Sequence, residues 1–390
     1  MNTKIQRIVV SLAVAGLIPV AQADDNMRKE IDALKKQNAE IMERLDATVS
    51  AMESRSGGGS SQTRIGGYGE LHYNNLENKA NGSKKDEVDF HRFVLFFGHD
   101  FSDKIRFHSE LEVEHAYTTD TADGSGPGAV ELEQAYVEFD LSDTQQARAG
   151  VFLVPVGFIN ETHEPPTFYG VERNPVESNI IPTTWWEAGA MYSQRFDGGV
   201  SLDFAAHSGL KTSASSNYAI RSGRQKTAKA SARDIAYSLR AKYTGVPGLE
   251  IGGTIQHQVN ITQSADPTAG AATLLEAHAS WQTGPFALRA LYATWDLDGT
   301  GPASVGADEQ TGWFIEPSYK FNKEVGVFAR YNQWDNRAGD ATDSEYSQVD
   351  VGLNYWPHPD VVLKIDYQDQ DAPGTSSEFD GINLGVGYQF

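Results

Sequence analysis

The sequence predicts an all-β fold: a 16-stranded antiparallel transmembrane β-barrel preceded by a short α-helical coiled coil. Three observations lead to this prediction. The last ten residues alternate between apolar side chains and small or polar ones, sixteen strand-like segments follow one another from residue 64 to residue 390, and short connections alternate with long ones. Membrane barrels with an even number of strands combine these three properties.

Residues 1–23 have the layout of a secretory signal peptide. Lys4 and Arg7 precede an apolar run, and Ala21 and Ala23 provide the small residues of a cleavage site. The run is short for a membrane-spanning helix, and no later segment offers the roughly 18 apolar residues that such a helix needs. We therefore expect export, removal of this peptide and localisation in the bacterial outer membrane.

The charge balance limits the possible partners. Of the 32 basic side chains, Lys4 and Arg7 belong to the signal peptide, which leaves 30 against 53 acidic ones, a net charge of about −23. Such an acidic chain is not expected to bind nucleic acid. The chain has no cysteine, so its stability must come from extensive backbone pairing or a large core.

Residues 24–53 form a separate segment with a heptad pattern and charged residues around it. Spacings of three and four connect the seam residues Met27, Ile31, Leu34, Asn38, Ile41, Leu45, Thr48 and Met52. The pattern predicts a short coiled coil, with a single amphipathic helix packed on another surface as the alternative. A coil of this length suits a homotrimer. Residues 54–63 are a flexible Gly/Ser linker.

The barrel is expected to span residues 64–390. Most of its segments are ten to twelve residues long, which crosses a bilayer at a tilt of about 45°. The expected strands are 64–74, 88–99, 104–115, 131–141, 145–154, 185–196, 200–209, 232–243, 249–259, 273–282, 285–295, 311–321, 325–334, 345–356, 360–369 and 380–390. Short turns at one end and connections of ten to thirty residues at the other are typical of such barrels.

The closing strand shows the expected faces most clearly. One face carries Ile382, Leu384, Val386, Tyr388 and Phe390. We expect this face to contact lipid, and Phe390 to lie at the periplasmic rim beside the strand that starts at Arg64. The opposite face holds Gly385 and Gly387, which leave space in the lumen. A soluble β-sandwich also alternates, but it would not so readily combine one-sided loop lengths with an export signal.

The connection 155–184 differs from the others. Its thirty residues contain five of the fifteen prolines together with several apolar side chains, including Phe158, Phe168 and Ile180. A long loop of this kind is usually functional, and its apolar content argues against disorder. We expect it to fold into the lumen and narrow it. The alternative is that it lies over the rim against a neighbouring subunit.

Around this loop, the stretch Gly150–Gly157 (GVFLVPVG), followed by Thr167-Phe168 and Glu172-Arg173, is similar to the pattern of the phosphate-selective porin O and P family, within the bacterial general porin superfamily. The resemblance implies a trimer of sixteen-stranded barrels, each a diffusion channel narrowed by its third outer loop. It also implies passive passage of small hydrophilic solutes or ions. The phosphate-selective members line the pore with basic residues, whereas basic and acidic residues are interleaved here.

The candidate site residues fall into three sets. The expected constriction is Glu161, His163, Glu164, Tyr169, Glu172, Arg173 and Glu177. The expected basic wall of the lumen is Arg106, Arg148, Arg195, Arg240, Arg289 and Arg330. A basic outer loop carries Arg221, Arg224, Lys226, Lys229 and Arg233. This loop either attracts anions at the outer mouth, or it is a solvated loop or one that binds the phosphates of lipopolysaccharide.

Other function classes find little support. The motifs of serine hydrolases, P-loop enzymes and zinc proteases are absent, so we expect neither an enzyme nor a cofactor. The face carrying His108, Glu110, Glu112 and Glu114 is read as a polar lumen stripe rather than a ligand set. No metal site is expected, because no acidic loop has the spacing of a calcium loop. The remaining alternatives are an anion- or phosphate-selective channel and a barrel-anchored interaction protein that uses the coiled coil.

Overall fold

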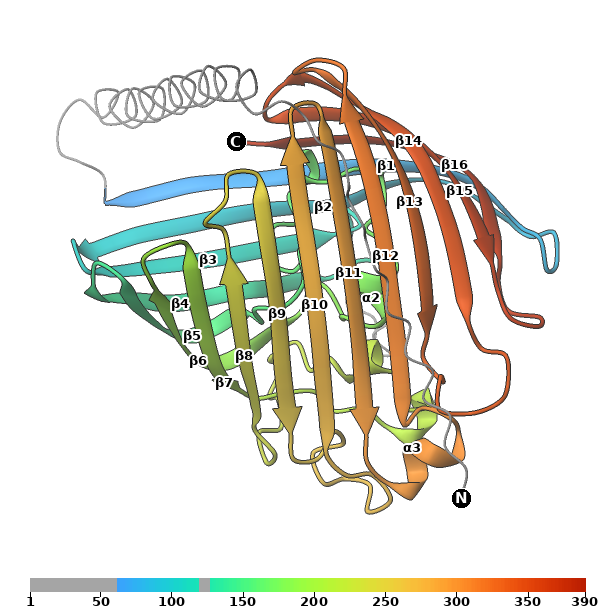
Figure 1. Cartoon of the computed structure of the whole chain (residues 1–390), viewed down its shortest axis with the longest axis horizontal. Helices are drawn as coiled ribbons and strands as arrows, with labels where there is room; N and C mark the ends of the chain where they lie inside the picture. Colours follow the sequence, from blue (N-terminus) through green and yellow to red (C-terminus); the bar gives the residue numbers. More distant parts are fainter. Residues whose placement is uncertain (1–61, 119–126) are drawn as a thin grey trace, which may run out of the picture. The chain divides into compact units, whose positions relative to one another are not determined.

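The computed structural model describes residues 62–118 and 127–390, and these form a closed antiparallel barrel of sixteen strands (Figure 1). The predicted fold class is thereby confirmed for the barrel. The expected signal peptide, the coiled coil and nearly all of the linker lie outside the described residues. The strands are β1 (Thr63–Asn78), β2 (Lys84–Ser102), β3 (Ile105–Glu114), β4 (Val130–Ser142), β5 (Gln145–Leu153), β6 (Trp186–Arg195), β7 (Val200–His207), β8 (Ala236–Tyr243), β9 (Leu249–Gln258), β10 (Ala272–Thr283), β11 (Phe286–Leu297), β12 (Glu309–Lys320), β13 (Val325–Asp335), β14 (Tyr346–His358), β15 (Val361–Asp371) and β16 (Phe379–Gln389).

All sixteen expected strands are present, and only their ends differ. The first two are longer than predicted, so the connection between them shrinks to residues 79–83 and is not one of the long loops. The eighth begins at Ala236 rather than at residue 232, because the preceding residues belong to a loop that folds inward. Each neighbouring pair is antiparallel, and every strand pairs with the next one in the sequence.

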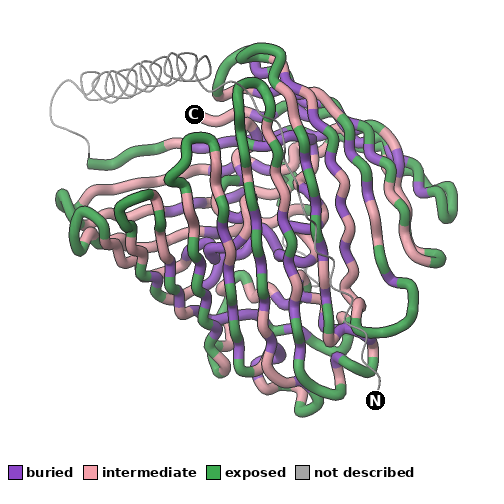
Figure 2. The backbone as a smooth tube through the Cα atoms, viewed as in Figure 1, coloured by how far each residue is buried: buried purple, intermediate pink, exposed green. Residues whose placement is uncertain are grey.

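The closing strand seals the barrel as expected. In the β1–β16 pair, Tyr68 lies opposite Gln389, and the amides of Gly67 and Phe390 donate to each other's carbonyl oxygens at 3.0 and 2.9 Å. Ile382 and Leu384 on the outer face are exposed, whereas Asn383 on the inner face is fully buried. This alternation recurs along most strands (Figure 2). An apolar exterior and a polar interior are the pattern of a barrel embedded in lipid.

A hydrophobic core lies inside the barrel. Residues from the connections 154–185, 209–223 and 259–271 pack against inner-face residues of β10 to β13, and the cluster includes Trp185 and Trp295. Four short helices occur in the first two of these connections: η1 (Pro165–Thr167), α2 (Val176–Asn179), η2 (Ala214–Ser216) and η3 (Ile220–Gly223). A further short helix, α3 (Thr300–Ser304), lies between β11 and β12. None of the helices in the described ranges is long and apolar enough to cross a membrane. Because the connections 154–185, 209–223 and 259–271 contribute residues to the internal core, they fold into the lumen rather than standing out in solvent.

Candidate functional site

The loop 155–184 is tied to one side of the lumen. The amide of Val171 donates to Asp366 of β15 at 2.6 Å, and Asn354 and Trp356 of β14 donate to the carbonyls of Phe168 and Pro166 at 3.1 and 3.2 Å. These contacts bury the inner faces of β14 and β15 beneath the loop. The inward folding expected from its proline and apolar content is present.

Two glycines of the closing strand make room for this loop. A Cβ atom built on Gly387 would lie 2.3 Å from Pro165, and one on Gly385 would lie 3.1 Å from Val171. The sequence suggested that these glycines leave space in the lumen. That space is filled by the loop, so the small residues of β16 serve close packing.

Glu177 anchors the loop from within. Its carboxylate accepts hydrogen bonds from the amides of Phe158 and Ile159 at 2.6 and 2.8 Å and from the side-chain amide of Asn174 at 2.8 Å. It is fully buried, and this burial raises its pKa, although the hydrogen bonds counteract the rise. The prediction placed Glu177 on the wall of the constriction, whereas the structure places it in the interior of the loop.

Asn160 is a second anchor, and the sequence analysis missed it. Its side-chain amide donates to the carbonyls of Val154 and Trp185 at 2.8 and 2.9 Å, and its carbonyl oxygen accepts from the Trp185 amide at 2.7 Å. The side chain thus joins the two ends of the loop. A buried asparagine with three satisfied bonds fixes a backbone conformation much as a turn does.

The first half of the loop also reaches the opposite wall. His163 is buried and lies 3.2 Å from a carboxylate oxygen of Glu110 on β3. Glu161 forms an ion pair with Arg240 of β8, which also contacts Asp203 at 2.7 Å. Of the other expected constriction residues, Glu164 is half-buried and Tyr169 packs against Phe328 and Trp356.

Glu172 lies where the loop meets β1. One of its carboxylate oxygens is 3.1 Å from Nδ1 of His72 and accepts a hydrogen bond from Asn74 at 3.4 Å. Although burial raises its pKa, the charge of His72 and the hydrogen bond to it are stronger and hold the pKa of the Glu172 carboxyl well below its usual range. This carboxylate is therefore ionised near neutral pH.

Most arginines of the expected basic wall are paired with carboxylates. Arg106 contacts Glu138 and Asp140 at 2.8 and 2.6 Å, and Arg148 contacts the same Glu138 at 2.7 Å. Farther round the barrel, the partners of Arg330 are Glu316 and Asp350, at 3.2 and 3.0 Å. Within residues 62–118 and 127–390, Arg195 and Arg289 donate only to backbone carbonyls, those of Asp143 and Thr167. Four of the six arginines are thus in ion pairs, whereas Arg195 and Arg289 keep their charge without a carboxylate partner among the described residues.

Further arginines without a carboxylate partner among the described residues occur on the loops. Arg173, Arg221 and Arg224, called here the arginine cluster, all donate to the segment 178–184. Arg173 bonds the hydroxyl of Thr184 at 2.8 Å, Arg221 bonds the carbonyls of Ser178 and Thr183, and Arg224 bonds that of Thr184, all three at 2.9 Å. None of the three forms an ion pair with a carboxylate of residues 62–118 or 127–390.

Electrostatics confirms that these arginines lie together. Burial, followed by the charges of Arg224 and Arg173, lowers the pKa of Arg221 to about 10, so the guanidinium stays charged at neutral pH. The pKa of Arg224 is also lowered by burial, while the charges of Glu131, Glu133 and Glu114 act in the opposite direction. Carboxylates of β3 and β4 are thus close to the arginine cluster.

The basic outer loop is only partly solvated, and its role in attracting anions or in binding lipopolysaccharide stays a prediction. Ile220 is fully buried in the core inside the barrel, and Arg221 and Arg224 turn inward beside it. Lys226 forms an ion pair with Glu131 of β4. Of the five basic residues of the loop, Lys226, Lys229 and Arg233 are exposed, whereas Arg221 and Arg224 are half-buried. Hydrophobic residues within this segment were the available sign that it folds inward.

Comparisons with known proteins agree with this architecture. A family model described as Gram-negative porin matches residues 47–375. An uncharacterised protein of Aquifex aeolicus (strain VF5) is 30% identical over 349 residues, covering 79% of this chain and 75% of that protein. The chain is also similar to two solved structures, each covering 84% of it and 99% of the other chain. An anion-selective porin from Comamonas acidovorans matches with a TM-score of 0.59 and 13% identity, and a trimer form of OmpT, an outer membrane protein of Vibrio cholerae, with 0.55 and 10%.

Proposed function

We propose a path for solutes and an ionic selectivity for the channel of this chain. Both start from the premise that the chain belongs to the Gram-negative porin family. The chain is an outer-membrane channel for small solutes. The proposed path runs along the inner faces of β2 to β5, past the arginine cluster. Ions and small hydrophilic solutes diffuse along it passively, down their concentration gradients.

The exposure of inward-facing side chains is the observation that supports this path. On β3 to β5, Arg106, His108 and Arg148 toward the short turns are partly exposed, whereas Glu110, Glu112 and Glu133 farther along the same strands are buried. On β13 to β16, Arg330, Asp366 and Asn383 are buried beneath the loop 155–184. Water that enters the lumen reaches the partly exposed side chains and is excluded from the buried ones.

The charges along this path favour general diffusion over a specific anion site. An arginine beside a carboxylate presents almost no net field to a passing ion, and Arg106 and Arg148 share Glu138. The arginine cluster lies near Glu114 and Glu131, so opposite charges stand close together beside the path and orient dipolar solutes. The phosphate selectivity that the resemblance implies remains a prediction, and the ion pairs of Arg106 and Arg148 argue against that selectivity.

A second candidate is an anion-selective channel. The observation in its favour is the arginine cluster, whose three guanidiniums have no carboxylate partner among the described residues. Under this alternative, an anion exchanges its hydration shell for those guanidiniums. The ionic selectivity of the open channel separates the two candidates.

We further propose that the functional unit is a homotrimer formed after residues 1–23 are removed, with lipopolysaccharide and lipid around it. The trimer form of the similar Vibrio cholerae protein and the heptad pattern of residues 24–53 support this assembly. The structural alternative, in which the barrel only anchors an interacting coil, predicts no conductance.

Planar-bilayer recording of the purified protein tests these proposals together. We expect conductance to rise and fall in groups of three steps, a small reversal potential in a salt gradient, and no block by millimolar phosphate. A strongly anion-selective reversal potential with phosphate block would favour the second candidate. Complete absence of conductance would contradict the channel proposal and favour the anchor.

A further inference from the structure

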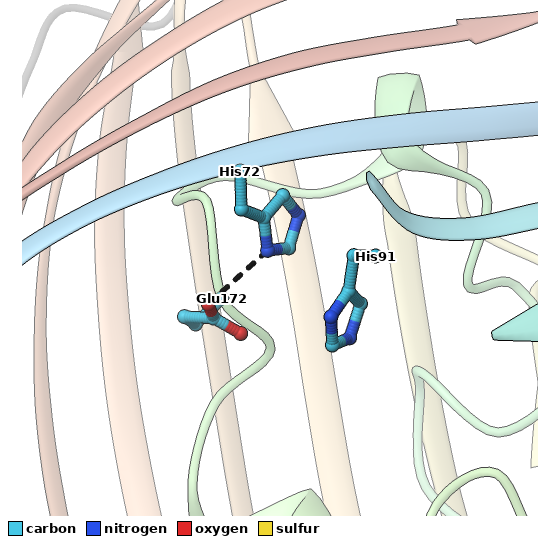
Figure 3. A group of neighbouring side chains, drawn as sticks. All are labelled: His72, His91 and Glu172. Atoms are coloured by element: carbon cyan, nitrogen blue, oxygen red, sulfur yellow. Dashed lines mark hydrogen bonds and ion pairs between the residues drawn. The ribbon is translucent and has the colours of Figure 1, made fainter. Parts of the chain in front are cut away.

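Two histidines and a glutamate from three separate parts of the chain meet where the loop 155–184 touches the wall (Figure 3). The ring of His72 on β1 stacks on that of His91 on β2, with centroids 4.6 Å apart and ring planes 12° from parallel. Nδ1 of His72 lies 3.1 Å from a carboxylate oxygen of Glu172. One ligand atom from each of the three residues lies within 4.8 Å of the other two.

An irregularity in the sheet brings these rings together. In the β1–β2 pair, Glu70 lies opposite Arg92, but His72 lies opposite Asp89, so β2 contains an extra residue between these pairs. Because of this β-bulge, His91 and Arg92 both reach the lumen side, where regular alternation would separate them. Bulges commonly redirect a side chain next to a functional site.

We propose that His72, His91 and Glu172 bind a divalent transition-metal ion, with Zn²⁺ as the best-fitting candidate. Imidazole nitrogens and a carboxylate oxygen are ligands of zinc, and three protein ligands leave a fourth position for water or a solute. A tetrahedral zinc ion at about 2.0–2.1 Å from its ligands keeps their atoms roughly 3.4 Å apart. The distance between His72 Nδ1 and Glu172 is close to this value, whereas the stacked His91 ring turns out of the stack to bring its nitrogen onto the same ion.

The surroundings of the histidines fit a metal site as well. Nε2 of His72, the nitrogen that does not face Glu172, lies 3.2 Å from a carboxylate oxygen of Glu70. A carboxylate on the second nitrogen of a ligating histidine fixes the ring and makes it a better ligand. The Glu172 side chain is 38% exposed and that of His91 is 28% exposed, so an ion can enter from the lumen.

A neighbouring set competes for the ion. Asp89, His91 and His115 also bring three ligand atoms within 4.8 Å, and Asp89 lies 2.9 Å from Nδ1 of His115. The first set is favoured because His72 is buried and Glu172 belongs to the loop. An ion there joins the loop to the barrel wall, and its expected effect is to narrow the lumen.

Zinc titration of the purified full-length protein in detergent tests this inference independently of conductance. We expect one Zn²⁺ to bind per chain, and Glu172→Gln and His91→Ala each to weaken binding by at least about 10-fold. Glu172→Gln keeps the shape of a loop residue, so the barrel remains folded. The matched control is His108→Ala, which removes a lumen-facing histidine outside both sets and leaves the zinc affinity unchanged.

His115→Ala distinguishes the two sets. If binding is lost in His115→Ala and retained in Glu172→Gln, the ion belongs to the Asp89 set and the proposal is wrong. The absence of saturable binding in the wild-type protein would also overturn it. Retained binding in His115→Ala together with weakened binding in Glu172→Gln supports the assignment.

Discussion

Replacement of Glu177 by alanine is expected to widen the channel. The carboxylate of Glu177 satisfies two backbone amides and the side chain of Asn174, all buried inside the loop 155–184. Each buried donor left without an acceptor costs about 1–3 kcal/mol, so the loop loses much of the free energy that holds its fold. We expect a higher single-channel conductance and faster entry of larger sugars into proteoliposomes.

The barrel itself should stay folded in this variant, because backbone hydrogen bonds between neighbouring strands close it without any contribution from the loop. Retained strand content in circular dichroism checks this point. Glu164→Ala is the matched control, since it removes the same group from a half-buried position on the same loop. Unchanged conductance in Glu177→Ala, or equal changes in both variants, would contradict the anchoring role.

Reversing the charge of two loop arginines should shift the ionic selectivity toward cations. In the double variant Arg221→Glu, Arg224→Glu, two positive charges beside the proposed path become negative, close to the carboxyl groups of Glu114, Glu131 and Glu133. Both positions lie within reach of a permeating ion, since screening extends over about 10 Å at 0.1 M salt. We expect a severalfold rise in the cation-to-anion permeability ratio, measured from reversal potentials in a salt gradient.

The same loop provides the control for this experiment. Lys229→Glu with Arg233→Glu makes the same change in charge at two exposed positions, away from the segment 178–184. We expect a much smaller shift from this pair, and one that fades at high salt. Equal shifts in the two double variants would show that the loop acts only through its overall charge at the outer mouth.

The barrel was predictable from the sequence because the residue pattern that specifies each strand lies within that strand. Alternation along a strand identifies the strand and its faces, as in 380–390, and each strand pairs with its neighbour in the sequence. Composition alone also indicated that the loop 155–184 packs inside. The start of the eighth strand was less clear because loop residues before Ala236 continued the pattern.

The details of the site depend on contacts between residues distant in the sequence. His163 meets Glu110 across 53 residues, and Glu161 meets Arg240 across 79. No local pattern indicates which arginine is neutralised by a carboxylate, or that Glu177 is buried. The set of His72, His91 and Glu172 was not predicted from the sequence, because its members come from two strands, one of them with a bulge, and from a loop.

The path of the channel is tested most directly by substituted cysteines, because the chain has none of its own. His108→Cys places a thiol on the partly exposed face of β3, and Asn383→Cys places one on β16, where the native side chain is fully buried beneath the loop. We predict that a charged methanethiosulfonate reagent reacts quickly with His108→Cys, lowers its conductance, and leaves Asn383→Cys unmodified. Rapid modification of Asn383→Cys with no effect on His108→Cys would contradict the proposed path.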